Sequence, residues 1–93
     1  MYEFQGFYIP ERMEHSIQDY IQHGIIPGSF LVAVISNNLK EAVGTADEEN
    51  KRNLPAYIGF FYNQAPSPCW GSEKKMKDWI RMHEEKREKE EKG

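Results

Sequence analysis

Cysteine is nearly missing from this chain of 93 residues, with Cys69 as its single example. An internal disulfide and a zinc site built from several cysteines are therefore excluded. The sequence also lacks an apolar signal region and a run of about 18 apolar residues, the length that a membrane-spanning helix needs. We therefore expect a cytoplasmic protein that makes no contact with a membrane.

Basic residues are scarce in residues 1–72, where four bases stand against eight acids and give a net charge of −4. Residues 73–93 hold eight bases and seven acids, a net charge of +1. A protein that binds duplex nucleic acid presents a basic face. Direct nucleic-acid binding is therefore not expected, whereas an acidic body can dock on a basic surface of another protein.

Catalytic and cofactor motifs are missing as well. No histidine stands near Cys69 in sequence to activate it as a nucleophile. His15 and His23 are eight residues apart, whereas metal-binding pairs on a helix sit four apart. The glycine-rich phosphate loops are not found. The three carboxylates of residues 47–49 are better explained as a helix cap. We expect a protein that is not an enzyme, has no cofactor and binds no metal.

The chain is long enough for one small domain with a modest core, since 39 % of its residues are apolar. The spacing of the apolar residues predicts helices near residues 10–23, 29–43, 47–64 and 72–84 or beyond. The predicted fold is all-α, a compact bundle of three to four helices within residues 1–83. An aromatic N-terminal arm precedes the bundle. Residues 84–93 contain no apolar side chain and are predicted to form a charged tail, either frayed or a solvated helix.

The ends of these helices are marked by capping residues. Ser29, Asp47 and Ser72 are predicted to cap helix N-termini by accepting backbone N–H groups. Gly24 suits the left-handed position that follows a helix, and Gly44 is predicted to end the second helix.

Two local alternatives stay open. Residues 30–36 could form a buried strand, but a helix is favoured because no other strand of similar quality is available as a partner; a break at Asn37-Asn38 is compatible with it. Pro55 either kinks the third helix or starts it again.

Asn50 follows Asp47 at the spacing of a capping box. The expected core includes Leu31, Ile58 and Trp79.

Aromatic residues crowd the second half of the chain. Tyr57 and Phe61 can line one face of the third helix, in which case Phe60 and Tyr62 point elsewhere. A helix that is apolar on more than one face is either buried or part of an interface. Trp70 either closes one end of the core or anchors an interface, a common use of tryptophan.

The order of small landmarks carries a resemblance. They are Gly24, Pro27-Gly28, Phe30-Leu31, Leu39, Ala46-Asp47, Glu49-Asn50, Tyr62-Asn63, Ala65-Pro66 and Trp70-Gly71-Ser72. With them, residues 9–80 resemble a family of short uncharacterised proteins found in phages, prophages and the bacterial accessory gene pool. The charged tail lies outside the resemblance. The resemblance implies a genomic setting and transfers no site residue.

The function expected from these features is non-catalytic binding that occludes a host protein. The target would belong to defence or gene-expression machinery, for example a nucleic-acid-handling enzyme such as a CRISPR effector; this step is an analogy with other small phage proteins. Acidic side chains would face a basic rim of the partner, and aromatic side chains would act as anchors. The expected contact residues are Glu14, Asp19, Glu48, Glu49, Phe60, Tyr62 and Trp70.

The alternative is a homo-oligomer that traps a small anionic nucleotide signal between its subunits. Arg12, Lys40, Lys51 and Arg52 would then converge on phosphate, with a tyrosine or phenylalanine stacked on the base. Two-fold symmetry would double each of these side chains. The identity of the target and the oligomeric state stay open at this point.

Overall fold

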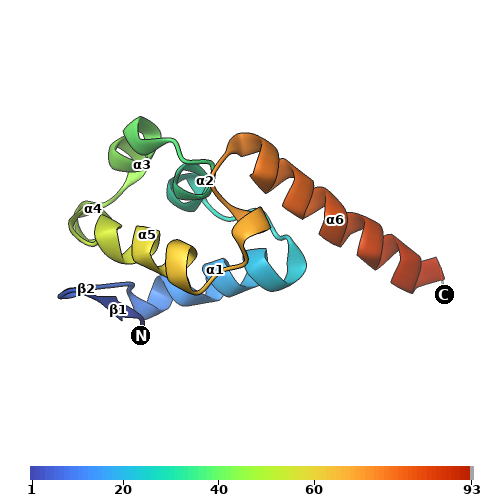
Figure 1. Cartoon of the computed structure of the whole chain (residues 1–93), viewed down its shortest axis with the longest axis horizontal. Coiled ribbons are helices and arrows are strands. Elements are labelled where there is room, and N and C mark those ends of the chain that lie inside the picture. Colours follow the sequence, from blue (N-terminus) through green and yellow to red (C-terminus); the bar gives the residue numbers. More distant parts are fainter. Residues whose placement is uncertain (93) are drawn as a thin grey trace.

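The computed structural model describes residues 1–92, with side chains placed through residue 90; Gly93 of the predicted tail lies outside the described residues. Within residues 1–92 the chain is mostly helical, as predicted, but this part contains six helices and a two-stranded hairpin instead of three to four helices alone. The elements are β1 (Glu3–Phe4), β2 (Phe7–Tyr8), α1 (Glu11–His23), α2 (Ser29–Ile35), α3 (Leu39–Thr45), α4 (Glu48–Arg52), α5 (Leu54–Asn63), the 3-10 turn η1 (Ser67–Cys69) and α6 (Glu73–Lys92). Helices α2 to α5 pack above α1, and α6 projects from one end (Figure 1), so the molecule measures 46 × 25 × 20 Å.

The N-terminal segment forms an antiparallel hairpin rather than an extended arm. Phe4 of β1 lies opposite Phe7 of β2. The two turn residues between them, Gln5 and Gly6, both have positive φ angles, 50° and 86°. Two positive φ angles define the type I′ turn, which matches the twist of a tight hairpin. The hairpin was not predicted because its strands are two residues long and Gln5 is not the asparagine or aspartate usual at this position.

The predicted helix over residues 29–43 is two helices. The break falls at Asn37, whose φ of 61° lies in the left-handed region that asparagine tolerates better than most residues. Asn38 then caps α3, because its side chain accepts the backbone N–H of Glu41 at 3.2 Å. The strand alternative for residues 30–36 is excluded, and the break lies where the two asparagines suggested it.

Two smaller predictions about the ends of these helices are also corrected. Gly28 occupies the N-cap of α2, so Ser29 is the first helical residue and does not cap it. Helix α3, the second part of the segment predicted as one helix, ends at Thr45 and not at Gly44. Leu39 and Val43 of α3 do not continue the buried face of α2, since they are 65 % and 43 % exposed.

The predicted helix over residues 47–64 is likewise divided, into α4 and α5. Asp47 caps α4 as predicted, accepting the N–H of Asn50 at 2.8 Å. Pro55 lies in the first turn of α5, where its missing N–H needs no partner, so it starts this helix and does not kink it. Asn50 does not complete a capping box, because its side chain turns inward and accepts the hydroxyl of Tyr57 at 2.6 Å.

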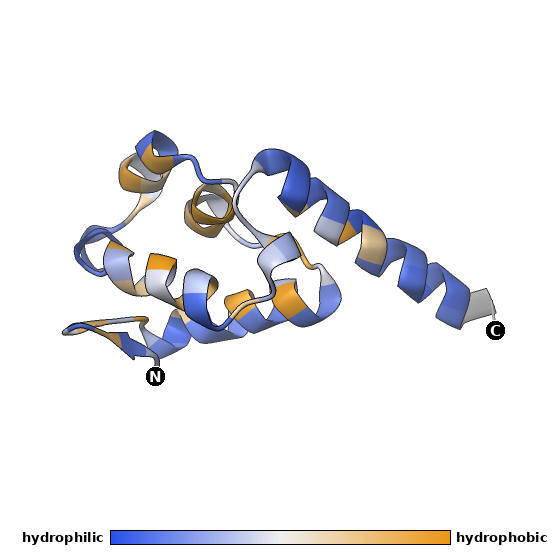
Figure 2. Cartoon of the chain, in the orientation of Figure 1, coloured by the Kyte–Doolittle hydropathy of each residue, from blue (hydrophilic) through white to orange (hydrophobic). Residues whose placement is uncertain are grey.

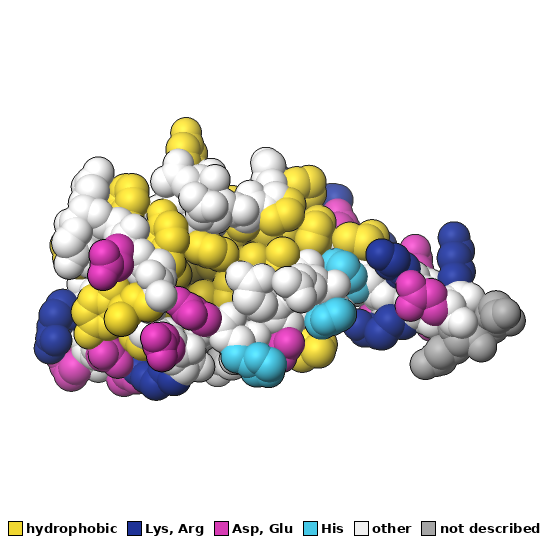
Figure 3. All heavy atoms as spheres, turned by 90° about the horizontal axis from the view of Figure 1, so that it is seen from below, with side chains coloured by type: hydrophobic (Ala, Val, Ile, Leu, Met, Phe, Trp, Pro, Cys, Tyr) yellow, Lys and Arg dark blue, Asp and Glu magenta, His cyan; other side chains and the backbone are white. Residues whose placement is uncertain are grey.

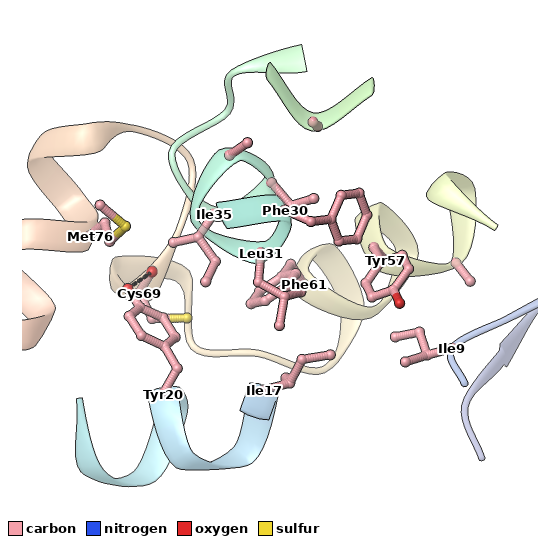
Figure 4. Packing of buried hydrophobic residues seen from close by; sticks show 14 residues of the cluster. Ile9, Ile17, Tyr20, Phe30, Leu31, Ile35, Tyr57, Phe61, Cys69 and Met76 are labelled. Carbon is pink, nitrogen blue, oxygen red and sulfur yellow. Dashed lines mark hydrogen bonds between the residues drawn. The ribbon is translucent and has the colours of Figure 1, made fainter. Parts of the chain in front are cut away.

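The core lies between α1, α2 and α5 (Figure 4). Its largest fully buried side chains are Tyr20, Tyr57, Phe61, Ile9, Ile17, Leu31, Ile35 and Cys69. The hydroxyl of Tyr20 donates to the backbone oxygen of Cys69 at 2.6 Å, which ties α1 to η1. The prediction that Leu31 belongs to the core is confirmed, Trp79 is half-buried against it, and Ile58 was wrongly placed there because it is 40 % exposed.

Helix α6 runs on from the core as a long polar helix (Figure 2). Ser72 caps it as predicted, accepting the N–H of Lys75 at 3.0 Å. Met76 is buried near its start. Of the two alternatives for the tail, the structure shows the helical extension, through Lys92. Among the described residues, no helix combines the length and apolarity needed to cross a membrane.

Candidate functional site

Helix α5 is apolar around its whole circumference. Ala56, Tyr57 and Phe61 are fully buried on its inner side, yet Ile58 and Tyr62 remain 40 % and 78 % exposed. Polar side chains would normally occupy the outer side of a surface helix, and apolar ones there mark an interface. The outer side of α5 is therefore the first candidate for a functional surface.

A groove runs along this outer side, and we call it the apolar groove. It encloses about 530 Å³. It is lined by Phe4, Leu54, Pro55, Ile58, Gly59, Tyr62 and Asn63. None of the described residues that line it is charged, so the groove suits an apolar side chain of a partner.

Gly59 explains how the hairpin contributes to the groove. A Cβ atom at this position would lie 2.7 to 2.9 Å from ring carbons of Phe4, closer than any real contact. The Phe4 ring therefore rests directly on the backbone of α5. Glycine in a helix interior costs about 1 kcal/mol relative to alanine, and a close approach of this kind is its usual reason.

The exposed apolar surface continues from α5 to α3. Leu54 and Ile58 also line a smaller hollow together with Leu39 of α3. Leu39 and, one turn further, Val43 are themselves largely exposed. We call the apolar groove together with Leu39 and Val43 the α3–α5 face. Contiguous apolar surface of this kind is more typical of a binding site than of free monomer surface.

The carboxylates of Asp47 and Glu49 serve a different purpose, because they join the start of α4 to α1 and to the hairpin. Arg12 donates to Asp47 at 2.9 Å and to Glu49 at 3.1 Å. The hydroxyl of Tyr8 donates to Glu49 at 2.8 Å. Acidic and basic side chains are mixed at this end of the molecule (Figure 3). Glu49, predicted to contact a partner, is thus held by contacts within the chain.

These contacts lower the pKa of both carboxyl groups. The pKa of Asp47 is lowered chiefly by the backbone N–H of Asn50, with Arg12 adding to the effect. The pKa of Glu49 is lowered chiefly by the hydroxyl of Tyr8 and then by Arg12. Both groups are therefore charged at neutral pH, and their hydrogen-bonding capacity is directed at the chain itself. In the part of the chain with placed side chains, no group of three or more His, Cys, Asp or Glu residues is arranged to hold a metal ion.

Two buried asparagines complete this junction. Asn50 is 4 % and Asn53 2 % exposed, and buried amides need hydrogen-bond partners. Asn53 accepts the N–H of Tyr8 at 3.0 Å and donates to the backbone oxygen of Glu49 at 2.9 Å. Asn50 accepts the Tyr57 hydroxyl. The landmark residues of this segment thus have structural roles.

Two other predicted contact residues, Asp19 and Glu48, remain at the surface. Asp19 lies 3.2 Å from the imidazole of His15 on the same helix. The side chain of Glu48 is 86 % exposed and makes only a loose ion pair, at 3.6 Å, with Lys51. Exposed pairs of this type contribute little to stability, so Glu48 is free to contact a partner.

Glu14 lies beside the hairpin, together with Phe60, one of the predicted anchors. Both line a cleft of about 280 Å³ between α1, α5 and the N-terminal residues. The carboxylate of Glu14 accepts the backbone N–H of Tyr2 at 3.1 Å. This cleft is separate from the apolar groove, so the predicted contact residues do not form one surface.

The three predicted aromatic anchors have different surroundings. Tyr62 is 78 % exposed and lines the apolar groove. Phe60 is half-buried and packs edge-on against Tyr2 and Phe61, with ring centroids 5.4 Å apart in each case. Trp70 is half-buried and lies 5.7 Å from the ring of Phe61, which agrees with the prediction that it closes one end of the core. Tyr62 alone has the exposure expected of an anchor.

The residues of the nucleotide-trap alternative are partly committed elsewhere. Arg12 is bound to Asp47 and Glu49, and Lys51 lies near Glu48.

Cys69 is fully buried, and burial raises the pKa of its thiol to about 11. This cysteine is therefore a protonated, packed side chain at neutral pH.

Of the nine members of the α3–α5 face, sequence reasoning named only Tyr62 as a contact residue; the eight it missed include Phe4, Gly59 and the α3 residues Leu39 and Val43. One signal for it was available, because a glycine in the middle of an apolar helix indicates close contact with another part of the chain. The exposure of the two α3 residues depends on the break at Asn37, whose position alone does not give the direction of the helix that follows.

Comparison with known proteins adds no relative. No protein-family model, curated protein or solved structure matches the chain. The functional argument therefore rests on the geometry of the α3–α5 face.

Proposed function

We propose that this protein is a non-catalytic binding protein that docks on another protein through the α3–α5 face and thereby occludes it. The observation that carries the proposal is the apolar groove on α5. Ile58 and Tyr62 line this groove and are exposed, although the opposite side of the same helix forms the core. Burial of apolar surface stabilises complexes at roughly 25 cal/mol per Å² before the cost of association is subtracted. Tyr62 on the rim is the anchor residue of the proposal.

The partner is proposed to be a protein that offers an apolar anchor surrounded by basic residues. The groove itself has no charged lining and accepts uncharged side chains. Residues 1–72 carry a net charge of −4, which steers association toward a basic surface and disfavours pairing of two copies. Glu48 is the carboxylate best placed by its exposure to contribute.

This proposal keeps the expected host target, a protein of defence or gene-expression machinery such as a nucleic-acid-handling enzyme. Such proteins present basic surfaces because they hold nucleic acid. An acidic protein with an apolar anchor can cover a surface of that kind without binding nucleic acid itself. The genomic setting implied by the resemblance agrees with this target class.

A comparative pulldown tests the proposal. The tagged protein and its Ile58→Lys variant are incubated with lysate of cells that carry the gene. We expect the wild-type protein to recover one partner in stoichiometric amount and Ile58→Lys to lose it, because a lysine in the groove buries an unpaired charge. Ile26→Lys is the matched control, since Ile26 is 64 % exposed and lines none of the groove.

Recovery of the same partner by wild type and Ile58→Lys would contradict the proposed surface. Recovery of no stoichiometric partner by any variant would contradict the proposed function. A symmetric oligomer in size-exclusion chromatography whose melting temperature rises with a nucleotide would instead support the trap alternative.

A further inference from the structure

Helix α6 is attached to the C-terminal end of α1 by side chains spaced two turns apart. The indole N–H of Trp79 donates to the backbone oxygens of Tyr20 and Ile21, at 3.2 Å to each. The guanidinium of Arg87 donates to the backbone oxygen of His23. The last carbonyls of a helix have no partner within it. Helix α6 therefore supplies donors to the exposed end of α1.

His83 lies one turn from each of these donors, in the middle of the contact. It packs so closely on α1 that a Cβ atom at Gly24 would lie 2.6 Å from the His83 Cβ. Its ring meets that of Trp79 edge-on at 5.2 Å. The Nε2 atom of His83 is buried and finds no hydrogen-bond partner among the side chains and backbone that the structure describes. His83 as a whole is half-buried, but a proton added at Nε2 would be shielded from solvent and would find no acceptor at that atom.

The charged groups around His83 are mainly basic. On α6 these are Lys86 and Arg87, and on α1 it is His23; among the side chains placed through residue 90, Glu90 is the one carboxylate that lines the same hollow. The hollow encloses about 200 Å³. A positive charge on His83 would thus meet two permanent cations and one carboxylate at the edge.

A further element in contact with α6 adds no charged side chain near neutral pH. It is η1, whose one titratable residue is Cys69. Burial raises the pKa of that thiol to about 11, so it stays neutral. The surroundings of His83 in the α1–α6 contact therefore favour its neutral form. One contribution is opposite, because the backbone oxygen of Ile21 favours the protonated form.

We propose that the docking of α6 on α1 is pH-sensitive, and that protonation of His83 at Nε2 releases α6 from the end of α1. The proton comes from solvent and converts the neutral imidazole to an imidazolium. The released helix exposes the rings of Trp79 and His83 together with the α1 carbonyls they covered. Acid thus exposes the indole of Trp79 beside a charged His83 at the end of the molecule opposite the hairpin.

The direction of the pH effect on α6 docking follows from the linkage between proton binding and docking. Burial is the largest cause that lowers the pKa of His83 below its ordinary 6.5, and the nearby cations lower it further. A group with a lowered pKa stabilises the docked state above its ordinary pKa, and this stabilisation is lost as the pH falls through the lowered value. The ratio of docked to released α6 changes by at most about tenfold for each pKa unit between the two states.

Hydrogen exchange of the Trp79 indole N–H tests the proposal on the full chain. Its protection factor is measured by NMR between about pH 7.5 and pH 5, the range in which histidine titrates. We expect protection to fall as the pH is lowered in the wild-type protein and to stay constant in His83→Leu, which cannot be protonated. His15→Gln is the control, because the side chain of this histidine is 86 % exposed and it precedes the α1 residues that α6 contacts.

Three outcomes overturn the proposal. These are constant protection in the wild type, an equal fall in His83→Leu, or a flat response in His15→Gln. If His83→Leu does not fold, the NMR titration of the His83 ring in the wild-type protein decides instead. A pKa below 6.5 supports the proposal, and a pKa at or above 6.5 overturns it.

Discussion

Gly24 and His83 touch so closely that a Cβ atom at position 24 would lie 2.6 Å from the Cβ of His83. Gly24 also has a φ of 67°, a left-handed conformation that side chains disfavour. We therefore expect Gly24→Ala to destabilise the protein by about 1–3 kcal/mol in urea unfolding, through both strain and overpacking.

Gly44→Ala is the matched comparison for this substitution. Gly44 lies within α3, and a Cβ atom there would meet nothing within 4 Å. Alanine is the better helix former by about 1 kcal/mol, so this variant should be more stable than wild type. Equal stability of the two variants would show that α6 does not pack on Gly24.

The hydrogen bond between Tyr57 and Asn50 gives a second prediction. Both residues are buried, and the hydroxyl is the donor to the Asn50 side-chain oxygen at 2.6 Å. Tyr57→Phe leaves that oxygen without its donor and should lower the free energy of unfolding by about 1–3 kcal/mol. Tyr62→Phe, which removes the same group from an exposed ring, should change it by less than about 0.5 kcal/mol. Similar effects of the two substitutions would argue against a buried Asn50–Tyr57 pair.

A third prediction is that Gly59→Ala changes stability in opposite directions in the presence and in the absence of the Phe4 ring. Gly59→Ala should destabilise the wild-type protein, because the new methyl group meets the ring of Phe4. In a Phe4→Ala background that ring is gone, and the same substitution should stabilise by about 1 kcal/mol through helix propensity. A double-mutant cycle by urea unfolding measures the coupling. Additive effects would mean that the ring does not lie on Gly59.

Acid should weaken the junction around Arg12. The pKa values of Asp47 and Glu49 are lowered in the folded protein. Their stabilising contribution is therefore complete above the ordinary carboxyl values near pH 4 and is lost as the pH falls through the lowered ones. Arg12→Gln and Tyr8→Phe should each flatten the loss of stability between neutral and acidic pH, measured by urea unfolding. An unchanged pH profile in both variants would contradict this origin.

Much of the secondary structure was predictable because its signals are local. Gly24 takes the left-handed angle that ends α1, and the side chains of Asp47 and Ser72 accept the backbone N–H groups expected of N-caps. These roles depend only on a residue and its near neighbours in sequence. The same holds for Pro55, where both alternatives were stated and the structure shows the helix start.

The α3–α5 face was less predictable because it depends on distant contacts. Ile58 shares a helical stripe with Tyr57 and Phe61, and periodicity placed all three in the core. In the folded chain, Ile58 instead lies on the exposed side of α5 beside Gly59, whose lack of a side chain lets the ring of Phe4 rest on the helix. A ring supplied by a hairpin more than fifty residues away in sequence leaves no periodic signal in the helix that receives it.

The central claim, that the α3–α5 face binds a partner protein, is tested most directly by site-specific photo-crosslinking in cells that carry the gene. A photoreactive phenylalanine analogue replaces Tyr62 in the apolar groove or, as the control, Ile26, which is similarly exposed and lies outside it. Crosslinks form only to groups within a few ångströms of the reactive ring. We predict one predominant crosslinked protein from position 62 that position 26 does not capture. No crosslinked protein from position 62, or the same proteins from both positions, would contradict the account.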